Sequence, residues 1–397
     1  MNKNLWLLAA AQGLFLTNNV TFIAINGLVG LALAPLGWMA TLPVMGYVVG
    51  GALSTPLVAK TQALYGRRAS FQIGLAVAIG SALLGAWAVV GHHFWLLVAA
   101  TVIAGYYSAN GQLYRFAAAE LALPAFREKA VSLVLAGGLI GAIAGPNLAA
   151  RTRTVLDVQF AGAYIALAVV ALVAMALMAA IRFPAAPAAP QGKTSGGRSL
   201  LEIMRQPVFA VACVSAALSY GVMNLLMAAT PLAMQQCGLG FDDAALVLEW
   251  HVIGMFAPGF FTGHLIKRFG TLQIMAVGAL LNLLCIGVAL SGVALPQFVV
   301  SLFLLGVGWN FLFTGSTTLS LGAYRPEEKD RAQAAINFCV FAVMALTSFA
   351  SGALVTTQGW SLLNVGSLIP VVLTMLALGW LALQQRAAKD NSTGSAS

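Results

Sequence analysis

The sequence predicts an all-α membrane protein with twelve transmembrane helices arranged in two six-helix bundles. Of its 397 residues, 60% are apolar and only 8% are charged, and the mean hydropathy is +0.90. So few charges cannot cover the surface of a soluble enzyme, so that class is excluded. A helix needs about 20 apolar residues to cross the hydrocarbon core, and the chain contains twelve apolar runs of that size.

The first six runs are predicted over 5–33, 37–59, 69–91, 95–120, 130–150 and 159–182. The second six are predicted over 208–235, 243–266, 271–293, 295–322, 332–356 and 361–385. Between them, residues 183–207 are rich in Pro, Gly and polar residues, a composition typical of a flexible linker. The predicted organisation is therefore a bundle over 1–182, a cytoplasmic linker over 183–207 and a bundle over 208–386. The small, polar tail over 387–397 is predicted to be disordered.

The charges indicate how the chain is oriented. The formal net charge is +9, and 17 of the 20 Lys and Arg residues fall on the side of both termini. The positive-inside rule then predicts cytoplasmic termini. Because the basic residues flank apolar runs, their partner is expected to be the lipid bilayer and not a nucleic acid. The four cysteines show no paired spacing, which excludes a disulfide framework and a CxxC metal site.

Ionisable residues inside the apolar runs are candidates for function, because each is expensive to insert into a membrane. Arg115 is interpreted as an anchor for an anionic substrate, as a gating partner of Glu120, or as part of a structural interhelical pair. Glu249 is a candidate proton-coupling carboxylate. The remaining substrate or gating candidates precede Arg115 in the sequence: Asn110, Gln112 and Tyr114.

Two pairs of soft side chains recur at helical spacing in the seventh and eighth runs. Met223 and Met227 are four residues apart, as are His251 and Met255, so each pair lies on one helix face. All four fall in the middle third of the bilayer on consecutive helices. Three thioethers and one imidazole would select Cu(I). Methionine packing beside a proton-relay histidine is the alternative.

The layout resembles the major facilitator superfamily over nearly the whole chain. Pro124 to Ala130 and Pro326 to Ala332 hold the same place in each half, and Gly66-Arg67-Arg68 matches part of the family's loop signature. The M-x-x-x-M and H-x-x-x-M pairs are similar to those of the CcoA-type copper importers, a branch that also holds RfnT-type riboflavin transporters. That resemblance implies a secondary active copper importer of the bacterial inner membrane that serves cytochrome oxidase assembly, with Met223, Met227, His251 and Met255 as ligands.

Copper import by alternating access is the first hypothesis, with copper as cargo, no cofactor, no enzymatic activity and a monomeric protein. The second hypothesis is an importer of riboflavin or a similar planar metabolite. Its cavity would use aromatic and amide groups, for which the candidates are Asn18, Asn19, Asn26, Gln112, Tyr114, Asn224, Trp250 and Trp309. The third is a proton-coupled drug exporter that depends on Glu249. A receptor or scaffold is disfavoured, because no loop is long enough to form a domain.

Overall fold

The computed structural model describes residues 3–123, 127–183, 197–325 and 328–394. The N-terminal half contains α1 (Lys3–Leu33), η1 (Gly37–Met39), α2 (Leu42–Val90), α3 (Phe94–Gly111), α4 (Tyr114–Leu121), α5 (Arg127–Thr152) and α6 (Ala161–Ala180). The C-terminal half contains α7 (Leu200–Met204), α8 (Pro207–Gln236), α9 (Phe241–Phe256), α10 (Gly259–Phe269), α11 (Thr271–Leu290), α12 (Leu295–Leu321), α13 (Lys329–Thr357) and α14 (Gly359–Gly394). The described residues contain no strand, so the all-α prediction is confirmed.

Each of the twelve predicted runs lies on helix. Within the described residues, eight helices are long and apolar enough to cross a membrane, or nine if α9 and α10, bent by 42°, form one span. The sequence predicts twelve spans and the structure gives eight or nine for two reasons. Helix α2 is counted once although it contains two predicted runs, and α3 and α5 are not among the helices that meet the length and hydropathy criteria. The two runs in α2 part at Gly66, whose φ of 77° favours a residue without Cβ. Gly270, with φ 97°, makes the equivalent turn before α11.

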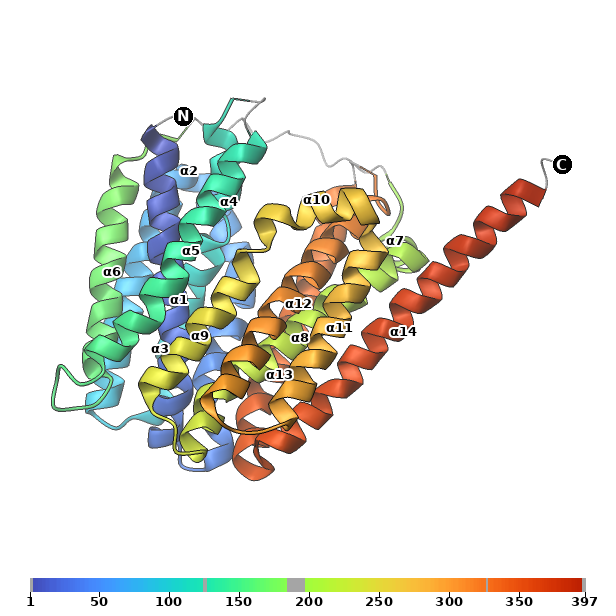
Figure 1. Ribbon diagram of the computed structural model, residues 1–397. Coiled ribbons are helices and arrows are strands. Elements are labelled where there is room, and N and C mark those ends of the chain that lie inside the picture. Colours follow the sequence, from blue (N-terminus) through green and yellow to red (C-terminus); the bar gives the residue numbers. More distant parts are fainter. Residues whose placement is uncertain (1–2, 124–126, 184–196, 326–327, 395–397) are drawn as a thin grey trace.

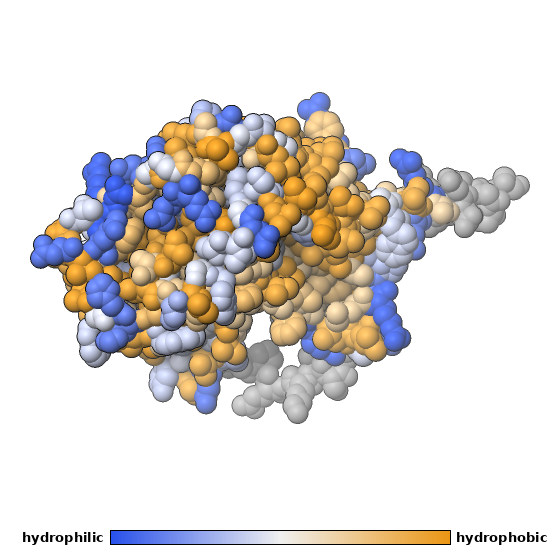
Figure 2. Space-filling model, turned by 90° about the horizontal axis from the view of Figure 1, so that it is seen from below, coloured by the Kyte–Doolittle hydropathy of each residue, from blue (hydrophilic) through white to orange (hydrophobic). Residues whose placement is uncertain are grey.

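The two halves lie side by side, and the helices of each run between two ends of the molecule (Figure 1). Both chain termini lie at one end, which we call the termini end. The other, which we call the opposite end, carries η1 and the connection between α5 and α6. Large apolar side chains exposed on the helices include Leu83, Trp87, Ile103, Leu172 and Leu376. Such exposed apolar side chains are expected of helices that face lipid. Viewed from the opposite end, the surface shows apolar residues mixed with hydrophilic ones (Figure 2).

The halves are joined at the opposite end. Four contacts connect them there: Arg153 with Asp242, Thr41 with Gly352, Trp38 with Phe349, and Phe160 with Phe241. The Gly352 N–H donates to Thr41 Oγ1 at 3.0 Å, in a position where neither group is exposed to solvent. At the termini end, by contrast, the ion pairs Arg67–Glu120 and Arg198–Glu328 each join groups of a single half.

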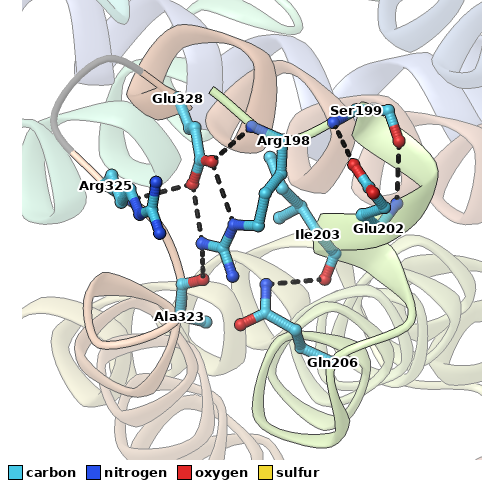
Figure 3. Close-up of polar contacts among 8 residues, drawn as sticks. All are labelled: Arg198, Ser199, Glu202, Ile203, Gln206, Ala323, Arg325 and Glu328. Atoms are coloured by element: carbon cyan, nitrogen blue, oxygen red, sulfur yellow. Dashed lines mark hydrogen bonds and ion pairs between the residues drawn. The ribbon is translucent and has the colours of Figure 1, made fainter. Parts of the chain in front are cut away.

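The predicted linker contains a short ordered anchor. Residues 184–196 lie outside the described residues, but α7 follows them and is capped by reciprocal hydrogen bonds between Ser199 and Glu202 (Figure 3). Arg198 donates two hydrogen bonds to the Glu328 carboxylate, from Nε to Oε1 at 3.0 Å and from Nη2 to Oε2 at 2.7 Å. The carboxylate of Glu328 also accepts from the Arg325 N–H at 2.9 Å. The chain therefore enters the C-terminal half at a position fixed against the α12–α13 connection.

The tail over 387–397, predicted to be disordered, is helical for most of its length. Helix α14 continues to Gly394 instead of ending near Arg386, and only 395–397 lie outside the described residues. Ala387, Ala388 and Lys389 are strong helix formers that continue a helix already nucleated within the bundle. Polar composition alone was a poor guide to where the helix ends.

Candidate functional site

Four aromatic side chains of the C-terminal half meet where it borders the N-terminal half, and we call Tyr220, Phe256, Trp309 and Phe313 the aromatic cluster. The rings of Trp309 and Phe313 on α12 are stacked, 5.2 Å apart with 9° between their planes. Tyr220 of α8 stands edge-on to both rings, each at 5.2 Å. Phe256, at the end of α9, lies 6.4 Å from Trp309. The stacked pair arises because residues four apart share one helix face.

Close packing of α12 against α9 sets the direction of this face. A Cβ at Gly306 would collide with the backbone of α9, 2.8 Å from the Met255 nitrogen, so only glycine permits this approach. Asn310 then donates to the Met255 carbonyl at 2.7 Å and accepts from Thr262 at 2.7 Å. These hydrogen bonds hold Asn310 against α9, and because Asn310 follows Trp309 on α12, they fix the direction in which the Trp309 and Phe313 rings point.

The three predicted methionine ligands come together beside the aromatic cluster, and we call Met223, Met227 and Met255 the methionine group. They are 2%, 6% and 7% exposed and pack with Trp309 in one apolar cluster. Ala24 of α1 belongs to the same cluster, so the N-terminal half contributes to it. Soft thioethers and aromatic rings thus pack together in one buried cluster at the interface of the halves.

His251 is fully buried and faces α12. Its Nδ1 lies 2.7 Å from the Leu302 carbonyl, which can only accept, so Nδ1 carries the proton and Nε2 is left as an acceptor. Nε2 has no hydrogen-bond partner. Within the described residues, no group of three or more His, Cys, Asp or Glu side chains could hold a metal ion. The four-residue copper site stays a prediction, because it depends on thioethers.

Arg115 belongs to the N-terminal half. The span that carries it is broken between α3 and α4, and Arg115 occupies the first turn of α4. Its guanidinium carbon lies 4.9 Å from the centre of the Phe116 ring. Its Nε is buried and has no hydrogen-bond partner.

The proposed ion pair between Arg115 and Glu120 is not formed. Glu120 instead accepts two bonds from Arg67, at 3.0 and 2.5 Å. The two residues are five apart on one helix, a spacing that places their side chains on different faces. The carboxylate turns toward Arg67, just after the kink of α2 at Gly66, which leaves Arg115 without an acidic partner among the described residues.

The other predicted site residues are mostly occupied by packing within one half. Asn110 accepts from Ser70 at 3.1 Å, and Tyr114 is buried with its ring against Phe15 and Phe71. Gln112 is exposed. Glu249 accepts from Asn147 of the N-terminal half at 3.0 Å, so it bridges the halves.

The amides expected to line a metabolite cavity also bond within their own halves. In each case the Asn side chain donates: Asn18 to Leu167, Asn19 to Tyr47, Asn26 to Phe22, and Asn224 to Thr347 and Ser348. Trp250 is 44% exposed and lies against Phe303, outside the aromatic cluster. Of the eight candidates for that cavity, Trp309 is the one that belongs to the aromatic cluster.

Sequence reasoning missed Tyr220, Phe256 and Phe313. The spacing of Trp309 and Phe313 was an available signal, since it equals the spacing that singled out the methionine and histidine pairs. Cys213 and Cys339 also pack together between α8 and α13. Their contact joins helices far apart in sequence, so spacing could not reveal it.

A small cavity lies inside the N-terminal half, lined by Asn18, Phe22, Tyr47, Ser81 and Tyr107 among others. Its volume of about 20 Å³ has room for one water molecule. Asn18 Oδ1 and the Tyr107 hydroxyl have no hydrogen-bond partner there. The cavity fits a structural water and is too small for a metabolite.

Comparison with known proteins places the chain in a family. The sequence profile of the Major Facilitator Superfamily matches residues 5–257 and 212–397. The riboflavin transporter RfnT of Brucella anthropi is 36% identical over 379 residues, which cover 95% of each chain.

Solved structures support the same fold. The POT family transporter PepTSo superposes with a TM-score of 0.74 at 11% identity, covering 98% of this chain and 99% of that one. The nucleoside transporter NupG gives a TM-score of 0.73 at 11% identity, covering 96% of this chain and 99% of that one. At these identities the likeness concerns the fold alone.

Proposed function

This chain belongs to the Major Facilitator Superfamily of multi-pass membrane transporters, and we propose that it imports riboflavin or a similar planar metabolite. The observation that carries the proposal is the stacked pair Trp309 and Phe313, 5.2 Å apart at 9°, at the interface of the halves. The proposal places the protein in a bacterial inner membrane with both termini in the cytoplasm. The similarity to a riboflavin transporter supports this cargo.

The chemistry of the surface suits a flat, conjugated cargo. A planar ring gains by offset or edge contact with aromatic side chains, with about 0.5–1.5 kcal/mol beyond the area buried. Thioether sulfur adds favourable contacts with aromatic rings and adapts to irregular shapes. The aromatic cluster and the methionine group supply both kinds of contact side by side, because Met255 and Trp309 pack in one buried cluster.

Copper import, the first hypothesis from the sequence, receives less support. The gathering of Met223, Met227 and Met255 favours it. The similarity to a riboflavin transporter over 95% of the chain does not. Copper therefore enters the experiment as the competing cargo.

The test is uptake by cells that lack their own riboflavin synthesis and uptake. We expect the protein to restore riboflavin uptake and Trp309→Ala to reduce it about tenfold, since 1.4 kcal/mol of lost stacking corresponds to a factor of ten. Trp250→Ala is the matched control, because Trp250 is 44% exposed and lies outside the aromatic cluster.

Copper uptake is measured in parallel, with reductant present, for the wild type and for Met227→Leu combined with His251→Leu. Riboflavin uptake that survives in this double variant would favour a flavin cargo. Copper uptake by the wild type that is lost in the double variant, without any riboflavin uptake, would overturn the proposal.

A further inference from the structure

The first residue of α9, Phe241, lies between the two halves at the opposite end of the molecule. Although it belongs to the C-terminal half, it packs against the apolar core of the N-terminal half that contains Phe22, Ile25 and Leu167. It also packs against the cluster that contains the methionine group and Trp309. Because α9 begins at the opposite end, Phe241 covers the side of the candidate site that faces that end.

The spacing of residues along α9 explains how one ring reaches the site. Phe241, Leu248 and Met255 follow one another at intervals of seven residues, so their side chains lie close to one helix face. Each of them belongs to the cluster around the methionine group or packs against it. The Gly240 N–H donates to the Asp243 carboxylate at 3.1 Å, which fixes where the helix begins. The first turn of α9 thus presents Phe241 to the same cluster that Met255 joins near the end of the helix.

The N-terminal half holds the Phe241 ring from two sides. The guanidinium carbon of Arg153 lies 4.9 Å from the centre of this ring, and Nη2 of Arg153 lies 3.2 Å from Oδ2 of Asp242. The Phe160 ring stands edge-on to Phe241, with 5.5 Å between ring centres and 61° between their planes. Both contacts favour an aromatic side chain at position 241 over an aliphatic one.

Phe160 makes its contact from an unusual backbone conformation. Its φ is 69°, in the left-handed region that bulky residues rarely adopt. Its N–H donates to the Arg153 carbonyl at 2.7 Å, and the residue is only 7% exposed. Such strain persists only where the surrounding structure imposes it, and it is concentrated at ligand clamps and switch regions. The α5–α6 connection therefore holds Phe160 and Arg153 together around Phe241.

We infer that Phe241 is a plug that seals the substrate site from the opposite end, and that Arg153 and Phe160 form the seat of this plug. The inference rests on the proposed function, because it takes the cluster around Trp309 as the substrate site. Passage of a substrate through the opposite end requires the ring to leave its seat, which breaks its contacts with Arg153 and Phe160. While the ring is seated, a bound substrate cannot leave through that end.

The test is the accessibility of a thiol placed behind the plug. Met227→Cys supplies this thiol in a protein whose four native cysteines are replaced by Ala. A membrane-impermeant, positively charged methanethiosulfonate reagent is added to membrane vesicles of either orientation, so that it reaches one end of the protein at a time. With Phe241 in place, we expect labelling to be slower from the opposite end than from the termini end. Equal rates from the two ends would overturn the inference.

Removal of the ring should open the opposite end. Phe241→Ala should raise the labelling rate from that end about tenfold, since 1.4 kcal/mol of lost ring contact corresponds to a factor of ten. Trp250→Ala is the matched control and should leave the rate unchanged, because Trp250 lies on the same helix, is 44% exposed and packs against Phe303. An unchanged rate in Phe241→Ala, or the same rise from both ends, would also overturn the inference.

A change in the seat provides a second test if Phe241→Ala does not fold. Arg153→Met leaves the ring in place but removes the cation–π contact and the ion pair with Asp242. Labelling from the opposite end should then rise about 2- to 5-fold, as expected for the loss of two partly exposed contacts. An unchanged rate would refute the inference.

Riboflavin uptake separates this inference from the proposed function. Labelling that depends on Phe241, in a protein whose wild type takes up no riboflavin, would refute the flavin cargo and support the plug. Riboflavin uptake by the wild type, with labelling that is insensitive to Phe241, would do the reverse.

Discussion

The contact between Thr41 and Gly352 gives a sharp test of how the halves are held together at the opposite end. A methyl group added at Gly352 would lie 2.9 Å from both the backbone nitrogen and Cγ2 of Thr41, well inside van der Waals contact. Relief requires α13 and the start of α2 to separate by about 0.5–1 Å. Overpacking of this kind is destabilising by about 1–3 kcal/mol.

This strain exists only while the halves touch at the opposite end. Gly352→Ala should therefore destabilise the closed arrangement relative to one in which that end has opened. A difference of 1–3 kcal/mol shifts a two-state equilibrium about 5- to 150-fold. The expected result is a larger population in which the opposite end is open.

Distances between spin labels report this population directly. One label is placed on Cys237, which is exposed at the end of α8, and the other on Val155→Cys, in the exposed α5–α6 connection. Cys339 is replaced by Ala to remove a second reactive thiol. We expect Gly352→Ala to broaden the distance distribution toward longer values.

A matched glycine provides the control. A methyl group at Gly366 of α14 would meet nothing within 4 Å, so Gly366→Ala should leave the distribution unchanged. An unchanged distribution in Gly352→Ala, or the same broadening in Gly366→Ala, would refute the reasoning.

Three further predictions concern ion pairs and hydrogen bonds. Asp242→Asn removes the pair with Arg153, but Asp242 is 73% exposed, so thermal stability should change by no more than about 0.5 kcal/mol, as calorimetry can check. The Arg198 side chain, with backbone N–H donors, holds the pKa of Glu328 well below its ordinary value of 4.5, so this pair stabilises the protein above pH 4.5 and progressively less as the pH falls further. Melting curves of Glu328→Gln should lose part of that acid sensitivity, and an identical pH dependence would contradict the assignment. Asn224→Leu removes the amide that donates hydrogen bonds to Thr347 and Ser348, and it should lower the free energy of unfolding by about 1–3 kcal/mol in a denaturant titration. A smaller loss than the same substitution causes at an exposed Asn would argue against this prediction.

Much of the fold could be predicted from the sequence, because the bilayer imposes a local rule. Each span must satisfy its own backbone hydrogen bonds, so an apolar run of sufficient length becomes a helix wherever it occurs. The turn at Gly66 and the basic residues after it could be found in the same way. The end of α14 could not, since the helix continues into polar residues after Arg386 on its own propensity.

The candidate site was harder to predict, because its members come from both halves. Helical spacing brought out the pairs Met223 with Met227 and His251 with Met255, and the structure gathers the three methionines. It did not indicate that the His251 ring would turn to the Leu302 carbonyl. Nor did it separate Trp309, buried in the aromatic cluster, from Trp250, which is 44% exposed.

The sequence by itself determined the membrane class, the helical runs and the residues that share one helix face, since each depends on neighbours within a few turns. Only the tertiary structure decided which polar groups have partners. Arg67, which follows the kink of α2 at Gly66, pairs with Glu120 of α4, and Arg115 on the same helix is left without an ion pair in the described part of the chain. Pairing of this kind depends on how separate helices pack, so the spacing of residues along the chain does not predict it.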